Sequence, residues 1–258
     1  MLQKERRNQI LALLHKQEMV KIPDLAKVFG VSVITIRRDL EELVRAGQIE
    51  KVYGGAILAP QAAVEPEAQR LFHARLAHNH REKMMIGMAA AKLVKDGETV
   101  ILNIGTTALA VAKHLETYDD LTVLTNSIPI LNQLANTRLN VYSLGGKLRG
   151  NELALHGSLA FKALNDFCVD KALIGAGGIS LENGITDHNL DSAELCSAIA
   201  KRSRQTILVA DSSKFGKDAS VIIGPLTCVE TIITDAGIPA EYAEGIRQAG
   251  IELIIVDI

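Results

Sequence analysis

The stretch ILNIGTTALAVAKHL holds residues that are suited to binding a phosphate group. Gly105, Thr106 and Thr107 lie between a predicted apolar strand and a predicted helix. The first backbone N–H groups of a helix have no partners within it, so together with two neighbouring hydroxyl groups they can hold an anion. A tight strand-to-helix turn capped by a threonine fits the same residues equally well, and the motif alone leaves both interpretations open.

Polar residues or glycines also follow several other predicted strands. Open α/β sheets bind ligands at the carboxyl ends of their strands, so we expect these segments to contribute to one site. Lys214 would add a positive charge for an anion, although a single lysine is often only a surface residue. The segments are Thr125–Asn126–Ser127, Gly145–Gly146 and Asp211–Ser212–Ser213–Lys214.

A second candidate surface lies in GVSVITIRRDL, which begins a predicted helix capped by Ser32. At about 100° per residue, Ile34, Thr35 and Arg38 fall on the exposed arc of this helix, and Arg37 lies at its flank. The apolar side chains that we expect to be buried fall on the opposite arc, and they are Val33, Ile36, Leu40, Leu43 and Val44.

The exposed residue types match the chemistry of base recognition. Arginine pairs with guanine through two hydrogen bonds, and an aliphatic side chain contacts the methyl group of thymine. Arg38, with Ile34 and Thr35, would therefore read bases in the major groove, whereas Arg37 would bind a phosphate or brace the domain. The alternative is an ordinary solvated helix face on which Ile34 is an incidental exposed residue.

The elements around this helix favour DNA recognition. We predict a helix over 4–16, a second over 23–29 that starts with a proline, and a third from Ser32 to near Gly47. Strand-like residues and a glycine pair in QIEKVYGGA then predict a hairpin. Two helices joined by a glycine turn and followed by a hairpin make a winged helix-turn-helix.

The rest of the chain alternates between predicted helices and almost wholly apolar strands such as SVIIG, ETIITD and IELIIVDI. This pattern is typical of a parallel sheet that is covered by helices on both faces. We assign residues 1–58 to the DNA-binding domain, 59–72 to a linker with two prolines, and 73–258 to the α/β domain.

The segments VSVITIRRDLEEL and YGGA resemble the N-terminal signature of the DeoR family of bacterial sugar-metabolism repressors, and the resemblance continues over nearly the whole chain. It implies a winged helix-turn-helix over about 3–58, with the DNA-contacting helices in 20–39. The family's wing, Arg-x-His-Gly-Gly-Ala, starts with a lysine here, which keeps the charge and loses the bidentate fork. The predicted DNA-binding residues are Ser32, Ile34, Thr35, Arg37, Arg38, Lys51, Tyr53 and Gly54.

The larger domain is similar to the C-terminal domain of that family, a Rossmann-like α/β domain related to ribose-5-phosphate isomerase and CoA transferases. The Gly-Thr-Thr loop matches the isomerase's phosphate loop, and Asp211–Lys214 matches its Asp-x-Ser-Lys segment. Asn103 stands where the family loop often has an acidic residue, and Asp187 with His188 would contact sugar hydroxyls. The predicted effector-binding residues are Asn103, Gly105, Thr106, Thr107, Thr125, Asn126, Ser127, Gly145, Gly146, Asp187 and Lys214.

The isomerase's acidic stretch would fall on residues 174–179, IGAGGI, which carry no carboxylate. Proton transfer between carbon atoms needs a positioned base, so we expect a binding pocket and not an enzyme. Glu194 is a possible remaining base, but a lone glutamate on a helix is more often structural.

We predict a transcriptional repressor of a carbohydrate transport or catabolism operon that responds to a phosphorylated sugar. An activator is not separated from a repressor, and the alternative is an isomerase-like enzyme with a DNA-binding head.

Composition and charge agree with these expectations. The 258 residues are 48% hydrophobic with net charge −2, which is enough chain for one or two cores. Residues 1–60 carry ten basic and seven acidic residues, and the remainder carries 18 and 23, so the head suits an anionic partner. Three separated cysteines without a CxxC motif argue against a zinc site or a disulfide framework, and we expect no metal or cofactor. With no signal or membrane span we expect a cytoplasmic protein, and a dimer or tetramer because one head makes few base contacts.

Overall fold

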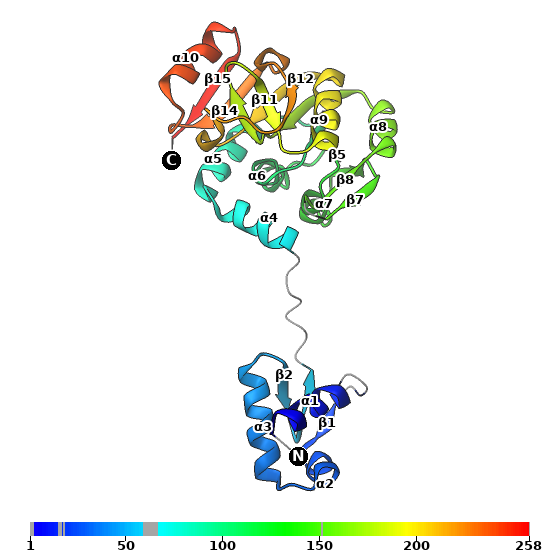
Figure 1. The fold of residues 1–258 in the computed structure, drawn as a ribbon. Helices are drawn as coiled ribbons and strands as arrows, with labels where there is room; N and C mark the ends of the chain where they lie inside the picture. Colours follow the sequence, from blue (N-terminus) through cyan, green and yellow to red (C-terminus); the bar gives the residue numbers. More distant parts are fainter. Residues whose placement is uncertain (1–2, 15–16, 18, 59–66, 151, 258) are drawn as a thin grey trace. The chain divides into compact units, whose positions relative to one another are not determined.

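The computed structural model describes residues 3–14, 17, 19–58, 67–150 and 152–257. The chain divides into two compact units, Met1–Pro66 and Glu67–Ile258, each with its own buried core. The elements of each unit are labelled in Figure 1. The linker expected over 59–72 falls partly on 59–66, which lie outside the described residues.

The N-terminal unit is a winged helix-turn-helix. Its strands form a three-stranded sheet in the order β1-β3-β2, in which both pairs are antiparallel. Ile10, Ile36, Leu40 and Ile49 are fully or almost fully buried between the helices and this sheet. The elements are α1 (Gln3–Leu14), β1 (Val20–Lys21), α2 (Ile22–Phe29), α3 (Val33–Arg45), β2 (Ile49–Val52) and β3 (Gly55–Leu58).

The turn between α2 and α3 follows from three residues. Pro23 lies in the first turn of α2, where its missing N–H costs no hydrogen bond. Gly30 ends α2 with φ of 62°, a left-handed conformation that a glycine adopts without strain. The Ser32 hydroxyl accepts a hydrogen bond from the backbone N–H of Thr35 at 3.2 Å and caps α3, as the sequence predicts.

The second unit begins with a helix and not with an irregular linker. Helix α4 spans Glu67–Ala77, so the linker prediction is wrong for residues 67–72. Phe72 is only 6% exposed, and Leu76 packs against the same core. The physical reason is the four-residue spacing of these two apolar side chains, which a helix places on one face.

A seven-stranded sheet lies at the centre of this unit, with the strand order β15-β14-β12-β9-β4-β5-β6. Every neighbouring pair is parallel, which confirms the predicted Rossmann-like architecture. The strands are β4 (Thr99–Leu102), β5 (Thr122–Thr125), β6 (Asn140–Ser143), β9 (Val169–Ile174), β12 (Ser203–Val209), β14 (Thr231–Asp235) and β15 (Glu252–Val256).

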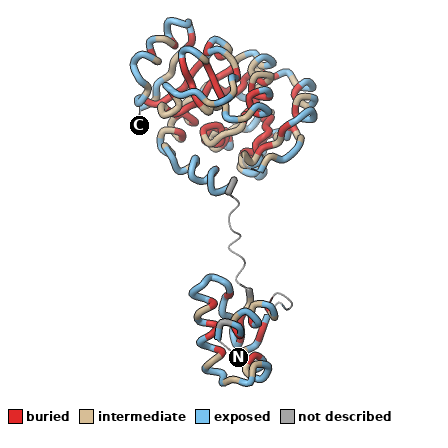
Figure 2. The backbone as a smooth tube through the Cα atoms, in the orientation of Figure 1, coloured by how far each residue is buried: buried red, intermediate tan, exposed pale blue. Residues whose placement is uncertain are grey.

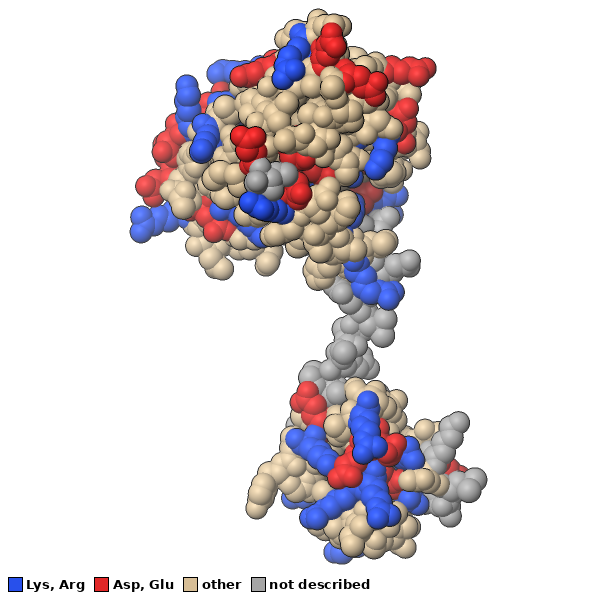
Figure 3. All heavy atoms as spheres, turned by 90° about the vertical axis from the view of Figure 1, so that its left-hand side faces the viewer, with Lys and Arg blue, Asp and Glu red and all other residues tan. Residues whose placement is uncertain are grey.

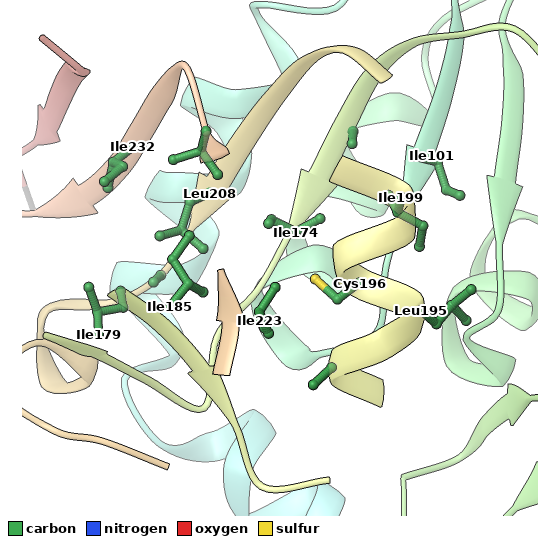
Figure 4. Close-up of a cluster of buried hydrophobic side chains, with 14 of the residues drawn as sticks. Ile101, Ile174, Ile179, Ile185, Leu195, Cys196, Ile199, Leu208, Ile223 and Ile232 are labelled. Carbon is green, nitrogen blue, oxygen red and sulfur yellow. The ribbon is translucent and has the colours of Figure 1, made fainter. Parts of the chain in front are cut away.

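Helices cover both faces of the sheet, and the strand residues alternate between two cores (Figures 1 and 2). Val100 and Leu102 pack with α5 (His80–Ala91), α6 (Thr106–Leu115) and α7 (Ile128–Leu134). Ile101 belongs to the opposite core, which contains α8 (Ser158–Asn165), α9 (Leu190–Arg202) and α10 (Ala240–Gln248). Figure 4 shows Cys196 and Ile199 of α9 packed over the strands of this second core. Burial on both faces explains why the strands are almost wholly apolar.

Two smaller pieces of β structure differ from the predicted series of parallel strands. The strand β13 (Val221–Gly224) pairs antiparallel with β11 (Gly184–Asp187), which also pairs with β10 (Gly178–Ser180). Ile222 is 60% exposed, so β13 is covered on one face only and the run SVIIG was wrongly placed in the parallel sheet. A hairpin of β7 (Lys147–Arg149) and β8 (Ala154–His156), with the helix α8, was not predicted.

Candidate functional site

The candidate ligand site is a cavity of about 410 Å³ at the point where the strand order reverses. From β4 the chain continues to β5 and β6 in one direction, whereas β9, β12, β14 and β15 follow in the other. Loops that leave neighbouring strands in opposite directions open a crevice at their carboxyl ends, where ligands of open α/β sheets bind. The cavity wall includes Asn103–Ala108 after β4, Gly175–Gly177 after β9 and Asp211 after β12.

Six of the predicted effector-binding residues line this cavity. The segment from the residue after β4 to the first turn of α6 contributes four of them, and the other two come from the end of β11 and from the turn after β12. They are Asn103, Gly105, Thr106, Thr107, Asp187 and Lys214.

The other five predicted residues are not part of the cavity wall. The strand β5 lies one position beyond β4, and its carboxyl end is covered by the β7–β8 hairpin through a bridge between Ser127 and Ala154. Their polar groups serve the fold: Ser127 caps α7, and Asn126 donates a hydrogen bond to the Leu155 carbonyl at 3.2 Å. The five residues are Thr125, Asn126, Ser127, Gly145 and Gly146.

The start of α6 offers free backbone donors to the cavity. Gly105 precedes the helix with φ of 126°, and a Cβ atom added to it would meet nothing within 4 Å, so its conformation and not space requires a glycine. It provides no side-chain cap, which leaves the first N–H groups of α6 without a side-chain partner. Thr106 and Thr107 are the first two residues of α6, and both line the cavity beside those donors.

Lys83 is a cavity residue that the sequence patterns did not indicate. It comes from α5, is 5% exposed, and donates hydrogen bonds to the carbonyls of Arg75 at 2.6 Å and His78 at 2.7 Å. Burial lowers the pKa of its ammonium group, Asp211 opposes that change, and Lys214 and Arg75 lower it further. Its sequence context, one lysine in a charged helix start, carried no signal of a binding role.

Asp211 is the acidic residue on which the charges of Lys83 and Lys214 act. Asn79 donates a hydrogen bond to its Oδ1 atom at 2.8 Å, while its Oδ2 atom is buried without a hydrogen-bond partner among the described residues. Burial raises the pKa of this carboxyl, but hydrogen bonds from Ser213 and Asn79 and the charges of Lys83 and Lys214 outweigh burial and hold the pKa below its usual range. Asp211 is therefore an ionised buried group with one acceptor oxygen left over.

A second group of polar residues lies around Glu152, between β7 and β8. Its Oε2 atom accepts a hydrogen bond from the Ser192 hydroxyl at 2.6 Å and lies 3.0 Å from Nε2 of the buried His156. Its Oε1 atom makes no hydrogen bond to the described residues. Nearby, Asp187 accepts a hydrogen bond from the Asn189 N–H at 3.2 Å, and both carboxylates line the cavity.

The candidate DNA-contacting residues lie on the exposed side of α3 and in the wing. Ile34 is 65% exposed, and Arg37 and Arg38 are exposed without an ion pair to any described residue. In the wing, Tyr53 is fully exposed beside Gly54, whose φ is 78°. The remaining predicted contacts are local, with the Ser32 and Thr35 hydroxyls 2.9 Å apart and Lys51 Nζ 3.2 Å from Glu41.

The buried face of α3 is narrower than predicted. Ile36, Leu40 and Leu43 are buried, but Val33 and Val44 are 39% and 38% exposed, because they lie at the two ends of the helix. The buried face contains one acid instead, Asp39, which was not expected there.

Asp39 joins α3 to α1. Its Oδ2 atom accepts a hydrogen bond from Arg6 Nε at 2.6 Å, and Arg7 Nε lies 3.7 Å from its Oδ1 atom. Arg7 also lies 3.8 Å from Glu42 on the next turn of α3. Figure 3 shows basic side chains around a small group of acidic ones on one face of this unit. These ion pairs set the orientation of α3 against the first helix.

Two models of known protein families match this chain, one in each of its two units. The model of the DeoR-like helix-turn-helix domain matches residues 6–62, and the model of the DeoR C-terminal sensor domain matches residues 78–236. The chain belongs to the DeoR family of transcriptional regulators. In that family the first unit is the DNA-binding domain and the second the sensor domain, and we use these names below.

Curated relatives match over almost the whole chain. A putative aga operon transcriptional repressor from Escherichia coli is 34% identical over 98% of this chain and 93% of its own length. The transcriptional regulator GolR from Listeria innocua is 33% identical over 98% of each chain, and the glycerol-3-phosphate regulon repressor of Escherichia coli is 31% identical over 98% of this chain and 99% of its own. These relatives are named as transcriptional regulators and not as enzymes.

The sensor domain is also similar to ribose-5-phosphate isomerase A from Methanocaldococcus jannaschii. The match has a TM-score of 0.41 and 17% identity, over 53% of this chain and 55% of the isomerase. A likeness of this size supports no statement about activity.

Further observations bear on the sequence predictions. Glu194, the possible remaining catalytic base, is exposed on α9 and is not part of the wall of the main cavity. Among the described residues, no group of three His, Cys, Asp or Glu side chains is arranged to hold a metal ion. Within the same residues, no helix is long and apolar enough to cross a membrane.

Proposed function

We propose that this protein is a repressor of a carbohydrate transport or catabolism operon, and that a phosphorylated sugar bound in the sensor-domain cavity changes its affinity for operator DNA. The observation that carries the proposal is the cavity at the strand-order reversal, where the free N–H groups at the start of α6 line the same space as Lys83 and Lys214. Helix N-termini and lysines are the groups with which proteins bind phosphate.

The proposal assigns binding and not catalysis to the cavity. Residues 174–179 line or adjoin it and have no carboxylate, and Glu194 lies elsewhere, so the acidic stretch that the isomerase uses is not reproduced. The carboxylates of the cavity wall, Glu152, Asp187 and Asp211, come from other segments, and we assign them to binding. The names of the curated relatives, which include a repressor of a glycerol-3-phosphate regulon, support a regulator that responds to a phosphorylated metabolite.

For the DNA-binding domain, we propose that α3 enters the major groove with its first turns. In this arrangement Arg38, Ile34 and Thr35 would meet base edges, and Arg37, Lys51 and the wing tip would contact phosphates. The exposure of Ile34 and of both arginines supports it, and Lys51 would exchange its ion pair with Glu41 for a phosphate. One such domain reaches few base pairs, so we propose that the protein binds repeated half-sites as a homodimer or homotetramer.

The test is a fluorescence-anisotropy titration of the wild type and of a Thr106→Val/Thr107→Val double variant on DNA from upstream of the protein's own gene. We expect sequence-specific binding for both proteins, and an affinity that changes with a phosphorylated sugar for the wild type only. Valine keeps the shape of threonine and removes the hydroxyl donors beside the phosphate.

The matched control is Thr117→Val, an exposed residue after the other end of α6 that is not in the cavity wall. It should respond as the wild type does. A wild type that shows no sequence-specific binding, with or without phosphorylated sugars, contradicts the proposed function, and a double variant with a normal response contradicts the phosphate site at α6.

A further inference from the structure

The cavity has two chemically different sides, which lie across the strand-order reversal from each other. Asp211 and Lys214 follow β12, on one side of β9, whereas Glu152 belongs to the hairpin that covers the end of β5, on the other side of β4. Neighbouring strands are about 4.8 Å apart, so β12 and β5 are separated by about 14 Å. The volume of the cavity, about 410 Å³, is in the range of sites that bind small molecules such as a sugar phosphate.

The first side is basic and suits the phosphate. Lys83 and Lys214 act on each other's charge there, together with Arg75, and the start of α6 adds its N–H groups. The negative charge of Asp211 compensates part of the positive charge on this side, and the remaining positive charge is available to an anion.

The second side is acidic and suits hydroxyl groups. Burial raises the pKa of Glu152, but its contacts with His156 and Ser192 and the charge of Arg149 outweigh burial and bring the pKa below its usual range, so the group is ionised at neutral pH. An ionised carboxylate is a hydrogen-bond acceptor only, and its Oε1 atom has no partner among the described residues. Burial raises the pKa of Asp187, backbone hydrogen bonds from Asn189 and His188 oppose this change, and the negative charge of the nearby Glu152 adds to it.

The Glu152 carboxylate is also held in place. Ser192 at the start of α9 donates to its Oε2 atom, and Arg149 from the same hairpin donates to Asn189 at 2.5 Å and Asp191 at 2.9 Å, which fastens the hairpin to α9. These contacts restrict the Glu152 side chain at the edge of the cavity.

We infer, building on the proposed function, that Glu152 and Asp187 bind the hydroxyl groups at the end of the effector remote from its phosphate, and that they make the site select phosphorylated sugars whose far end is uncharged. A sugar acid phosphate would bring a second negative charge against these carboxylates. The site then distinguishes an aldose phosphate from the aldonate made from it by oxidation, although the two differ at one carbon.

The experiment is calorimetric titration of the full-length protein, in a buffer that contains a chelator, with three kinds of probe. Inorganic phosphate tests the basic side, a panel of aldose phosphates (glucose 6-phosphate, galactose 6-phosphate and ribose 5-phosphate) tests both sides, and the matching aldonate phosphates carry the added charge. For the wild type we expect the best aldose phosphate to bind at least about tenfold more tightly than its aldonate.

The variants are Glu152→Gln and Asp187→Asn, with Glu182→Gln as the matched control, because Glu182 is exposed in the turn between β10 and β11 and is not in the cavity wall. Glu152→Gln should bind inorganic phosphate as tightly as the wild type and the aldose phosphate about tenfold more weakly. The preference of this variant for the aldose phosphate over the aldonate phosphate should also be smaller. Asp187→Asn gives an independent answer if Glu152→Gln, judged by its melting curve, does not fold.

The outcomes separate this inference from the proposed function. If neither inorganic phosphate nor any sugar phosphate binds the wild type, the proposed effector function is contradicted. If sugar phosphates bind but aldonates bind as well or better, if both variants behave as the wild type does, or if binding to this side needs a metal ion that the chelator removes, the inference about Glu152 and Asp187 is wrong and the proposed function stands.

Discussion

At the scale of single residues, the same side-chain type has different roles according to what surrounds it. Arg37 and Arg38 are neighbours on α3, both exposed and without an ion pair among the described residues, which leaves their charge available to DNA. Arg6 is 7% exposed and its charge is used by Asp39. The buried Arg6–Asp39 pair therefore contributes to the fold, and the two exposed arginines are the candidates for DNA contact.

Arg38→Ala should weaken binding to the specific operator by about 1–3 kcal/mol and relax the preference at one base pair, because a bidentate contact to guanine discriminates by that amount. The measurement is anisotropy on an operator series with single base changes. Arg45→Ala is the control, since Arg45 is exposed at the other end of α3 and pairs with Glu42 at 3.0 Å. An equal loss on every DNA sequence would instead identify Arg38 as a phosphate contact.

Asp211→Asn should destabilise the sensor domain at neutral pH by about 1–3 kcal/mol, because it removes a charged acceptor of two side-chain hydrogen bonds next to two lysines. The folded pKa of Asp211 lies below its unfolded value, so its stabilisation is complete above the unfolded pKa and is lost as the pH falls through the folded one. Melting curves from pH 7 downwards should therefore show the difference from wild type shrinking below about pH 4. A difference that does not depend on pH would show that the charge of Asp211 is not what stabilises the domain.

At the scale of elements, the two candidate sites are built in the same way, from the first turn of a helix. The first turns of α3 carry the candidate base contacts, and the first turn of α6 carries the candidate phosphate donors. Each helix is held by contacts further along, α3 by its buried face and Asp39, and α6 by its packing on α5 and β4. The end of each helix is thus free to meet a ligand without weakening the fold.

Asp39→Asn should loosen α3 from α1, because removing one partner of a buried ion pair costs about 3–5 kcal/mol. Hydrogen exchange on the full-length protein should show faster exchange in α1 and α3, with the parallel sheet of the sensor domain unchanged. Replacing both partners, as in Arg6→Met/Asp39→Leu, should be closer to wild type, since no unpaired charge is then buried. If the double variant is less stable than Asp39→Asn, the pair stabilises the domain by more than charge compensation.

At the scale of the whole molecule, the two domains have separate cores, so the binding properties of one domain can be tested without the other. The fragment 67–258 contains every described residue of the cavity wall and both cores of the sheet, so it should bind inorganic phosphate with the affinity of the full chain and should not bind DNA. Calorimetry and anisotropy measure the two properties. A loss of phosphate affinity in this fragment would show that the DNA-binding domain contributes to the effector site.

Regulation requires more than two sites in one chain. A ligand changes operator affinity only if it binds more tightly to one of two states that differ in DNA binding. Helix α4 is the first described element after the DNA-binding domain, and Lys83 of the cavity is bonded to the carbonyls of Arg75 in α4 and His78 just after it. A phosphate that recruits Lys83 therefore acts on the contacts that hold the end of this helix.

The local sequence predicted the parts of this protein whose signals lie within a few residues. The proline of α2, the left-handed Gly30 and the Ser32 cap act on neighbouring backbone groups, so the helix-turn-helix was predicted nearly to the residue. Burial on both faces makes the parallel strands apolar, and this also is visible in a single run of residues. The strand-to-helix turn at Gly105–Thr107 was predicted for the same reason, and its phosphate-binding role stays a prediction.

The tertiary structure decided what depends on distance in the fold. Thr125 to Ser127 look like a strand-end site in sequence, but they lie outside the cavity wall, and their polar groups bond the hairpin, the start of α7 and each other. Glu152 and Asp39 lie far along the chain from Ser192 and Arg6, and Lys83 from Asp211, so the contacts that define their roles do not repeat with any local period. Contacts between distant segments are set by the order of strands and helices in the fold. The spacing of residues in a single sequence does not show which distant segments meet.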